Sequence, residues 1–242
     1  MLRSIAVSLV LSAAACAVAG SQPMLTDASP TQLPRVVLIG DSIRGGYQPL
    51  VERKLTGVAE VVGPGGSTSR SVLENLDAWI LSRNPAVVHI NCGLHDCYIE
   101  ESGQLRVPLD EYRVNLTKIF DRLSRESRAR IVWATTTPVI EERQIASRPP
   151  NGYGRLVRRD SDVRAYNAVS VELARSRGIE VHDLYGVVMA AGRDTLLGHD
   201  GIHYTDAGNE VLARAVAEIV RARLGRAGGP DPARLAGLPR VP

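Results

Sequence analysis

Five short apolar runs recur along the central part of the chain, separated by longer segments of mixed character. The runs cover residues 35–39, 58–62, 86–91, 129–134 and 179–183. A nearly continuous apolar run of this length is typical of a strand buried on both faces of a parallel sheet. The pattern therefore predicts five parallel strands.

The segments between these runs carry apolar residues at every third or fourth position, as helices with one face on a core do. The clearest stripes cover residues 109–123 and 163–173, and a last one begins after Thr205, whose hydroxyl suits a helix N-cap. Alternating strands and helices predict an α/β fold, a three-layer α/β/α sandwich of the flavodoxin-like type. Such a sheet places ligands at the carboxyl ends of its strands.

The N-terminal segment has the features of an export signal. Arg3 is followed by an apolar stretch that ends in Ala17-Val18-Ala19, a small-x-small cleavage pattern, and the stretch is shorter than the roughly 20 residues that span a bilayer. We expect cleavage after residue 19 and a secreted or periplasmic protein. The alternative is a lipoprotein signal ending at residue 15, with Cys16 lipidated and the protein anchored to the membrane. The position three before that cysteine holds Ala13 rather than the usual Leu, which favours simple cleavage.

The remaining segments have simple predicted roles. Residues 20–34 are rich in Pro, Ser and Thr and are predicted to be a linker, residues 35–225 form one domain, and the Gly- and Pro-rich residues 226–242 are predicted to be a disordered tail. The formal charge of +3 is small and its basic residues are scattered, which argues against nucleic acid as a partner. Cys92 and Cys97 either pair or remain free, and no histidine stands at the spacing of a zinc site.

Candidate chemistry lies at two opposite ends of the domain. Ser42 follows the first predicted strand, where it is either a nucleophile near a helix N-terminus or only an N-cap serine. Asp200 and His203 precede the last helix, and an Asp three residues before a His can fix the tautomer of a base that activates a serine. Both segments fall on the carboxyl edge of the same predicted sheet, which favours a joint site.

The chain resembles the SGNH/GDSL hydrolase superfamily through four motif blocks in order. These are Gly40-Asp41-Ser42, Gly63-Pro64-Gly65-Gly66-Ser67-Thr68, Asn91-Cys92-Gly93-Leu94-His95-Asp96 and Asp200-Gly201-Ile202-His203. The resemblance implies an SGNH hydrolase fold and an esterase with Ser42 as nucleophile, His203 as base and Asp200 as its partner. It also implies an acyl-enzyme mechanism without metal or cofactor.

The same resemblance implies an oxyanion hole built from the backbone N–H groups of Ser42 and Gly66 and from a side chain of the third block. That block usually reads Gly-x-Asn-Asp, whereas this chain has His95 at the position of the Asn. A neutral imidazole can donate one N–H, so we expect His95 to be the third donor. Asn91 is the alternative donor, although we expect its side chain to be satisfied by the backbone.

Two other classes of function remain possible from the sequence. A metal-dependent hydrolase would draw its ligands from His95, Asp96, His199, Asp200 and His203. Gly201 argues against the helix that a His-x-x-x-His ligand pair would need. A non-catalytic binding module on the same fold is the other alternative, because fold does not determine function.

The substrate is the least defined property. Exported members of the superfamily often remove acetyl groups from carbohydrates, so the resemblance implies a small acyl ester, possibly on a carbohydrate. Lysophospholipids, thioesters and aryl esters are alternative substrates. No long apolar lid helix is evident, and residues 140–159 are expected to overhang the site.

Overall fold

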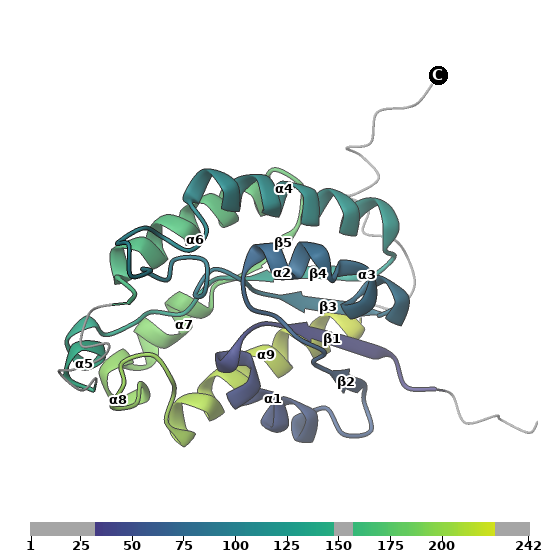
Figure 1. Ribbon diagram of the computed structural model, residues 1–242. Coiled ribbons are helices and arrows are strands. Elements are labelled where there is room, and N and C mark those ends of the chain that lie inside the picture. The colour runs from purple at the N-terminus through teal and green to yellow at the C-terminus, as the bar shows by residue number, and fades with distance from the viewer. Residues whose placement is uncertain (1–31, 148–156, 226–242) are drawn as a thin grey trace, which may run out of the picture. The chain divides into compact units, whose positions relative to one another are not determined.

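Five parallel strands form one sheet in the order β2-β1-β3-β4-β5 in the computed structural model, which describes residues 32–147 and 157–225 (Figure 1). The strands are β1 (Arg35–Ile39), β2 (Glu60–Val62), β3 (Val87–Ile90), β4 (Arg130–Ala134) and β5 (Glu180–His182). Each predicted run contains a strand, so the predicted α/β sandwich with a five-stranded parallel sheet is confirmed. The predicted signal and tail lie outside the described residues.

The second strand is shorter than the apolar run that predicted it. It begins at Glu60 rather than at residue 58, because the backbone N–H groups of Val58 and Ala59 donate to the carbonyl of Leu55 at 2.9 and 3.1 Å. These two residues close the turn after the preceding helix and are not available to the sheet.

The order of the strands contains a change of direction beside β1. The chain passes from β1 to β2 on one side and then returns to β3 on the other side of β1, where Leu38 of β1 aligns with His89 of β3. In open parallel sheets the crevice at such a point, beyond the carboxyl ends of the two strands, is where ligands bind. The segments after β1 and β3 therefore meet at the expected place.

Helices cover both faces of the sheet. They are α1 (Ser42–Lys54), α2 (Ser69–Glu74), α3 (Leu76–Trp79), α4 (Leu109–Glu126), α5 (Glu141–Ala146), α6 (Asp160–Arg175), α7 (Leu184–Ala191), α8 (Arg193–Leu196) and α9 (Asp206–Leu224), with a 3₁₀ turn at Leu81–Arg83. Figure 1 shows α2, α4 and α6 on one face and α1 and α9 on the other. Thr205 caps α9 as predicted, accepting from the N–H of Gly208.

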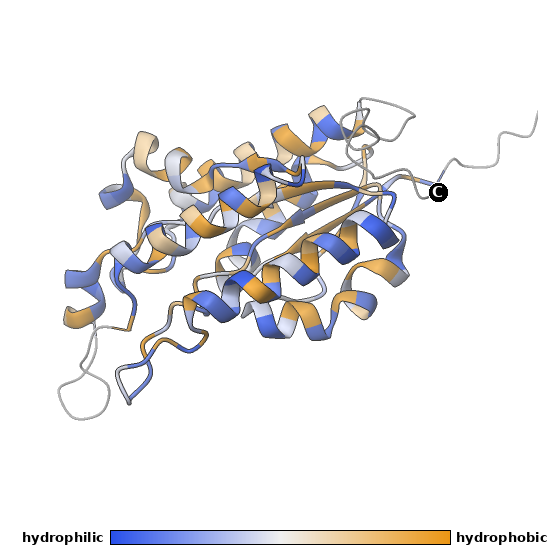
Figure 2. Cartoon of the chain, turned by 90° about the horizontal axis from the view of Figure 1, so that it is seen from above, coloured by the Kyte–Doolittle hydropathy of each residue, from blue (hydrophilic) through white to orange (hydrophobic). Residues whose placement is uncertain are grey.

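The core lies where the helix stripes meet the strands. In α4, Tyr112, Leu116, Ile119, Phe120 and Leu123 are fully buried. Burying an apolar side chain of this size stabilises a fold by about 1.5–3 kcal/mol. Figure 2 shows strongly hydrophobic strands between helices whose hydrophobic and hydrophilic positions alternate. Within the described part of the chain, no helix is both long enough and apolar enough to cross a membrane.

Candidate active site

Ser42 is the first residue of α1, directly above the end of β1. The N-cap of this helix is Asp41, whose Oδ1 accepts the N–H of Ile43 at 2.9 Å. The alternative interpretation of Ser42 as an N-cap serine is therefore wrong, because Asp41 fills that role. The side chain of Ser42 is exposed and free to meet a partner.

That partner is His203, from the loop before α9. Its Nε2 lies 2.9 Å from the Oγ of Ser42, and its Nδ1 lies 2.6 Å from Oδ2 of Asp200. The structure thus brings together three side chains from opposite ends of the domain, in the hydrogen-bonded order that nucleophilic serine catalysis uses.

Asp200 is held in the ionised form by its hydrogen bonds. Partial burial works to raise the pKa of its carboxyl, but the ring of His203 and the N–H groups of Ile202 and His203 outweigh it and lower the pKa overall. A permanently charged Asp200 keeps a proton on Nδ1 of His203. The Nε2 atom then faces Ser42 as an acceptor.

The loop that carries Asp200 and His203 is clamped by the segment after β4. The N–H of Ile140 donates to the carbonyl of Gly201 at 2.8 Å. Gly201 has φ +68°, and a Cβ there would lie 2.2 Å from the carbonyl oxygen of Ile140. Only glycine fits this close approach, so the turn between Asp200 and His203 depends on it.

Arg143 of α5 adds a second clamp that the sequence did not reveal. Its guanidinium donates to the carbonyls of Leu197 at 2.7 Å, Gly198 at 3.3 Å and Asp194 at 2.8 Å. These carbonyls belong to residues more than 50 positions away, and no motif marks such contacts. The start of the segment predicted to overhang the site therefore packs against the residues that lead into the Asp200–His203 loop. Residues 148–156 of the same segment lie outside the described residues.

Gly66 lies beside the end of β1, as the oxyanion-hole prediction requires. Its φ is +140°, and a Cβ on it would meet the backbone of Gly40 at 2.5–2.7 Å. The carbonyl of Gly65 also accepts the N–H of Gly40 at 3.3 Å. Within the described residues, the backbone N–H groups of Gly66 and Ser42 have no hydrogen-bond acceptor.

His95 and Asn91 differ in how far their donors are already used. The side-chain amide of Asn91 donates to the carbonyl of Ala134 at 2.8 Å and to Oγ1 of Thr136 at 3.3 Å, so the expectation that the backbone satisfies it is confirmed. Asn91 lies just beyond β3 rather than on it.

The ring of His95 has no hydrogen-bond partner among the described residues. Burial is the largest cause that lowers the pKa of His95, and the charges of Arg158, Arg106 and His203 act in the same direction against the opposing charge of Asp41. The imidazole is thus neutral near pH 7.

The five residues proposed for a metal site do not form one cluster, although Asp200 and His203 lie together. Asp96 is fully buried and accepts the N–H of Ser69 at 2.8 Å, and His199 is exposed to solvent. Over residues 32–147 and 157–225, no group of three or more His, Cys, Asp or Glu side chains is arranged to hold a metal ion.

Cys92 and Cys97, for which pairing and free thiols were both possible, are both buried free thiols.

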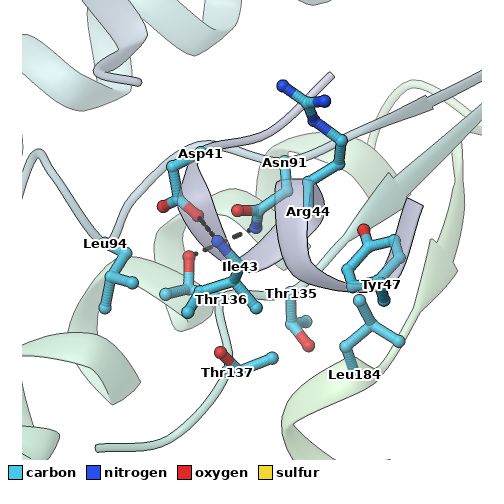
Figure 3. A pocket seen from close by; sticks show the side chains of 10 residues that line it. All are labelled: Asp41, Ile43, Arg44, Tyr47, Asn91, Leu94, Thr135, Thr136, Thr137 and Leu184. Carbon is cyan, nitrogen blue, oxygen red and sulfur yellow. Dashed lines mark hydrogen bonds between the residues drawn. The ribbon is translucent and has the colours of Figure 1, made fainter. Parts of the chain in front are cut away.

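A small cavity lies beneath the nucleophile rather than at it. Its volume of about 10 Å³ is the room that one water molecule needs. Figure 3 shows Asp41, Asn91 and Thr136 at one side and Tyr47 and Leu184 at the other. Ser42 and His203 lie outside this lining. Both of these residues are instead exposed on the described surface.

Comparison with known proteins points to one family. The profile of the GDSL-like lipase/acylhydrolase family matches residues 38–211. A GDSL esterase/lipase of Oryza sativa subsp. japonica is 26% identical over 205 residues, covering 78% of each chain. The human isoamyl acetate-hydrolyzing esterase 1 homolog is 27% identical over 194 residues, covering 74% of this chain and 78% of the relative. An acetylxylan esterase of Geobacillus stearothermophilus has the same fold, with a TM-score of 0.63, 19% identity and coverage of 81% of this chain and 96% of that one.

Proposed function

The chain belongs to the GDSL-like lipase/acylhydrolase family and is a carboxylic ester hydrolase, and we propose that it cleaves small acyl esters through Ser42, His203 and Asp200. The observation that carries the proposal is the continuous hydrogen-bonded line from Ser42 Oγ through the His203 ring to Asp200, at 2.9 and 2.6 Å.

The proposed reaction has two halves. Ser42 Oγ attacks the ester carbonyl as its proton passes to Nε2 of His203, while Asp200 stabilises the imidazolium. His203 then gives that proton to the leaving alcohol, which leaves an acyl group on Ser42. Water, deprotonated by His203, releases the acid and restores the enzyme.

The negative charge that grows on the carbonyl oxygen needs donors that are not already bonded. The unused backbone N–H groups of Ser42 and Gly66 supply two of them in this proposal. His95 supplies the third, because its ring is neutral and free while the amide of Asn91 is already bonded.

We further propose that the substrate is a small acetyl ester, possibly on a carbohydrate, and that the protein is exported. The exposure of Ser42 and His203 supports a substrate that meets the enzyme at its surface. The acetylxylan esterase and the isoamyl acetate-hydrolyzing esterase homolog are both named for acetyl esters, which supports the same choice. The N-terminal segment supports export, with either cleavage after residue 19 or lipidation of Cys16.

The test combines a substrate series with removal of the nucleophile. Wild type is expected to hydrolyse 4-nitrophenyl acetate faster than the butyrate and octanoate esters, and to release acetate from acetylated xylose. Ser42→Ala should keep its melting temperature but lose about 10⁶-fold in kcat, as loss of a nucleophilic serine does. A variant that kept a tenth of the wild-type kcat would refute the role of Ser42.

A further inference from the structure

Arg158, which lies two residues before α6, is a buried cation next to the proposed oxyanion hole. Only 7% of the residue is exposed. Its Nε donates to the carbonyl of Leu94 at 2.7 Å, and its guanidinium lies 5.2 Å from the centre of the Tyr98 ring. Arginine is almost never buried to this extent without an anionic partner.

Within the described residues, Arg158 has no carboxylate within ion-pair distance. The neighbouring residues 148–156 contain neither Asp nor Glu. Arg106 lies over the same Tyr98 ring at 4.2 Å, but it is already paired with Glu100 at 2.6 Å. The two terminal nitrogens of Arg158 donate to no described residue, and neither is fully enclosed by protein, so they keep contact with solvent. Among the described residues, Arg158 is thus a fixed cation with two unused donors.

Arg158 is anchored to the main chain directly beside His95. Leu94, whose carbonyl accepts from Arg158, directly precedes His95 in the chain. The charge of Arg158 acts on the imidazole of His95, as that of His203 does. An ester bound at Ser42 with its carbonyl oxygen near His95 would therefore have this cation nearby.

We propose that Arg158 binds a carboxylate carried by the alcohol half of the substrate, so that the enzyme acts on acetyl esters of hydroxy acids or uronic acids. This inference rests on the proposed esterase function. A planar guanidinium with two free terminal nitrogens matches the two oxygens of a carboxylate. An acetyl group carries no ionisable group, so the carboxylate must belong to the leaving alcohol.

The test compares an anionic ester with a neutral ester of nearly the same shape, namely 4-acetoxybenzoate and its methyl ester. Arg158→Gln removes the charge but keeps a donor for Leu94, and Arg158→Lys keeps the charge but loses the planar fork. Arg125→Gln is the matched control, because Arg125 is exposed on α4 and its replacement lowers the net charge by the same amount.

We expect Arg158→Gln to lower kcat/KM for 4-acetoxybenzoate about 30-fold or more, the usual consequence of losing one member of a buried charged pair. Activity on the methyl ester should stay within about threefold of wild type, Arg158→Lys should lie between, and Arg125→Gln should change neither. Equal loss on both esters would mean that Arg158 only supports the loop, and would overturn the proposal.

A second measurement needs no variant at all. In wild type, 4-hydroxybenzoate should inhibit hydrolysis of the methyl ester competitively and more strongly than methyl 4-hydroxybenzoate does, and this preference should weaken as salt increases. Equal inhibition by the two compounds would also overturn the proposal. Failure of the proposed esterase mechanism would look different. In that case wild type would cleave neither ester, or the Ser42→Ala variant would cleave both esters as well as wild type does.

Discussion

A buried pair of histidines makes the stability of this protein depend on pH in a way that can be measured. His89 on β3 and His182 on β5 lie on the same face of the sheet, with Nε2 and Nδ1 of the two rings 3.0 Å apart. One ring donates and the other accepts, so at least one must be neutral. Burial lowers the pKa of both, and that of His182 falls to about 4.

The sign follows from comparing folded and unfolded chains. An unfolded histidine takes up a proton as the pH falls below about 6.5, whereas folded His182 does so only near its lowered pKa of about 4. Its contribution is therefore fully present above about pH 6.5 and is lost as the pH falls toward 4. Between pH 7 and about pH 4.5 the loss amounts to about 2 kcal/mol.

Asp96 acts in the opposite direction. Burial raises the pKa of its carboxyl to about 6, despite the hydrogen bonds from Ser69. Its contribution is fully present below the unfolded value near 4 and is lost as the pH rises through 6, so acidification to about pH 4.5 adds about 2 kcal/mol. The contributions of His182 and Asp96 have opposite signs, so the wild-type curve alone would not separate them.

Single substitutions separate them. Urea unfolding at pH 7 and about pH 4.5 should show that the free-energy gap between wild type and His182→Gln shrinks by about 2 kcal/mol on acidification, since the variant has lost the group that resists protonation. The gap between wild type and Asp96→Asn should grow by a similar amount. His199→Gln removes an exposed histidine, and the difference between its free energy of unfolding and that of wild type should be the same at both pH values. If the gap to His182→Gln were the same at both pH values, the reasoning about the buried pair would be wrong.

Three further predictions concern the active site. His95→Ala should lower kcat by about 10²–10³ with little change in KM, and His95→Asn should recover much of the loss, so steady-state kinetics with unchanged kcat would refute the oxyanion role. Asp200→Asn should lower kcat by about 10⁴, because the amide favours the wrong tautomer of His203, and a pH–rate profile identical to wild type would contradict this. Arg143→Gln should lower kcat more than it raises KM, because only the position of the Asp200–His203 loop changes, and Arg143→Lys should retain part of the kcat that Arg143→Gln loses. An Arg143→Gln variant with a lower melting temperature but normal kcat would show that the arginine has a purely structural role.

The fold was predictable because its signal is local and repeated. Strands buried on both faces leave continuous apolar runs, and each helix leaves its own stripe, as in α4. The errors are at strand ends, where a tertiary contact decides. At Val58 the side chain fits a strand, but its N–H is used by the carbonyl of Leu55.

The three residues of the Ser42–His203–Asp200 line were also predictable, because each lies in a short motif beside a strand end or helix start. Arg143 and Arg158 were not. Their partners are main-chain carbonyls more than 50 residues away in the chain, and a carbonyl carries no side-chain identity that a sequence could reveal. Only the folded chain shows that Arg143 holds the segment that leads into the Asp200–His203 loop. It also shows that Arg158 has no carboxylate within ion-pair distance among the described residues.

The departure of the third motif block shows how sequence and structure combine. From residue types alone, Asn91 is as good a donor as His95, and the amide resembles the family pattern more closely. The structure separates them because the amide of Asn91 already donates to Ala134, while the ring of His95 is unbonded within the described residues. A histidine in this position must be neutral to match an asparagine, and burial is the largest cause that keeps it so.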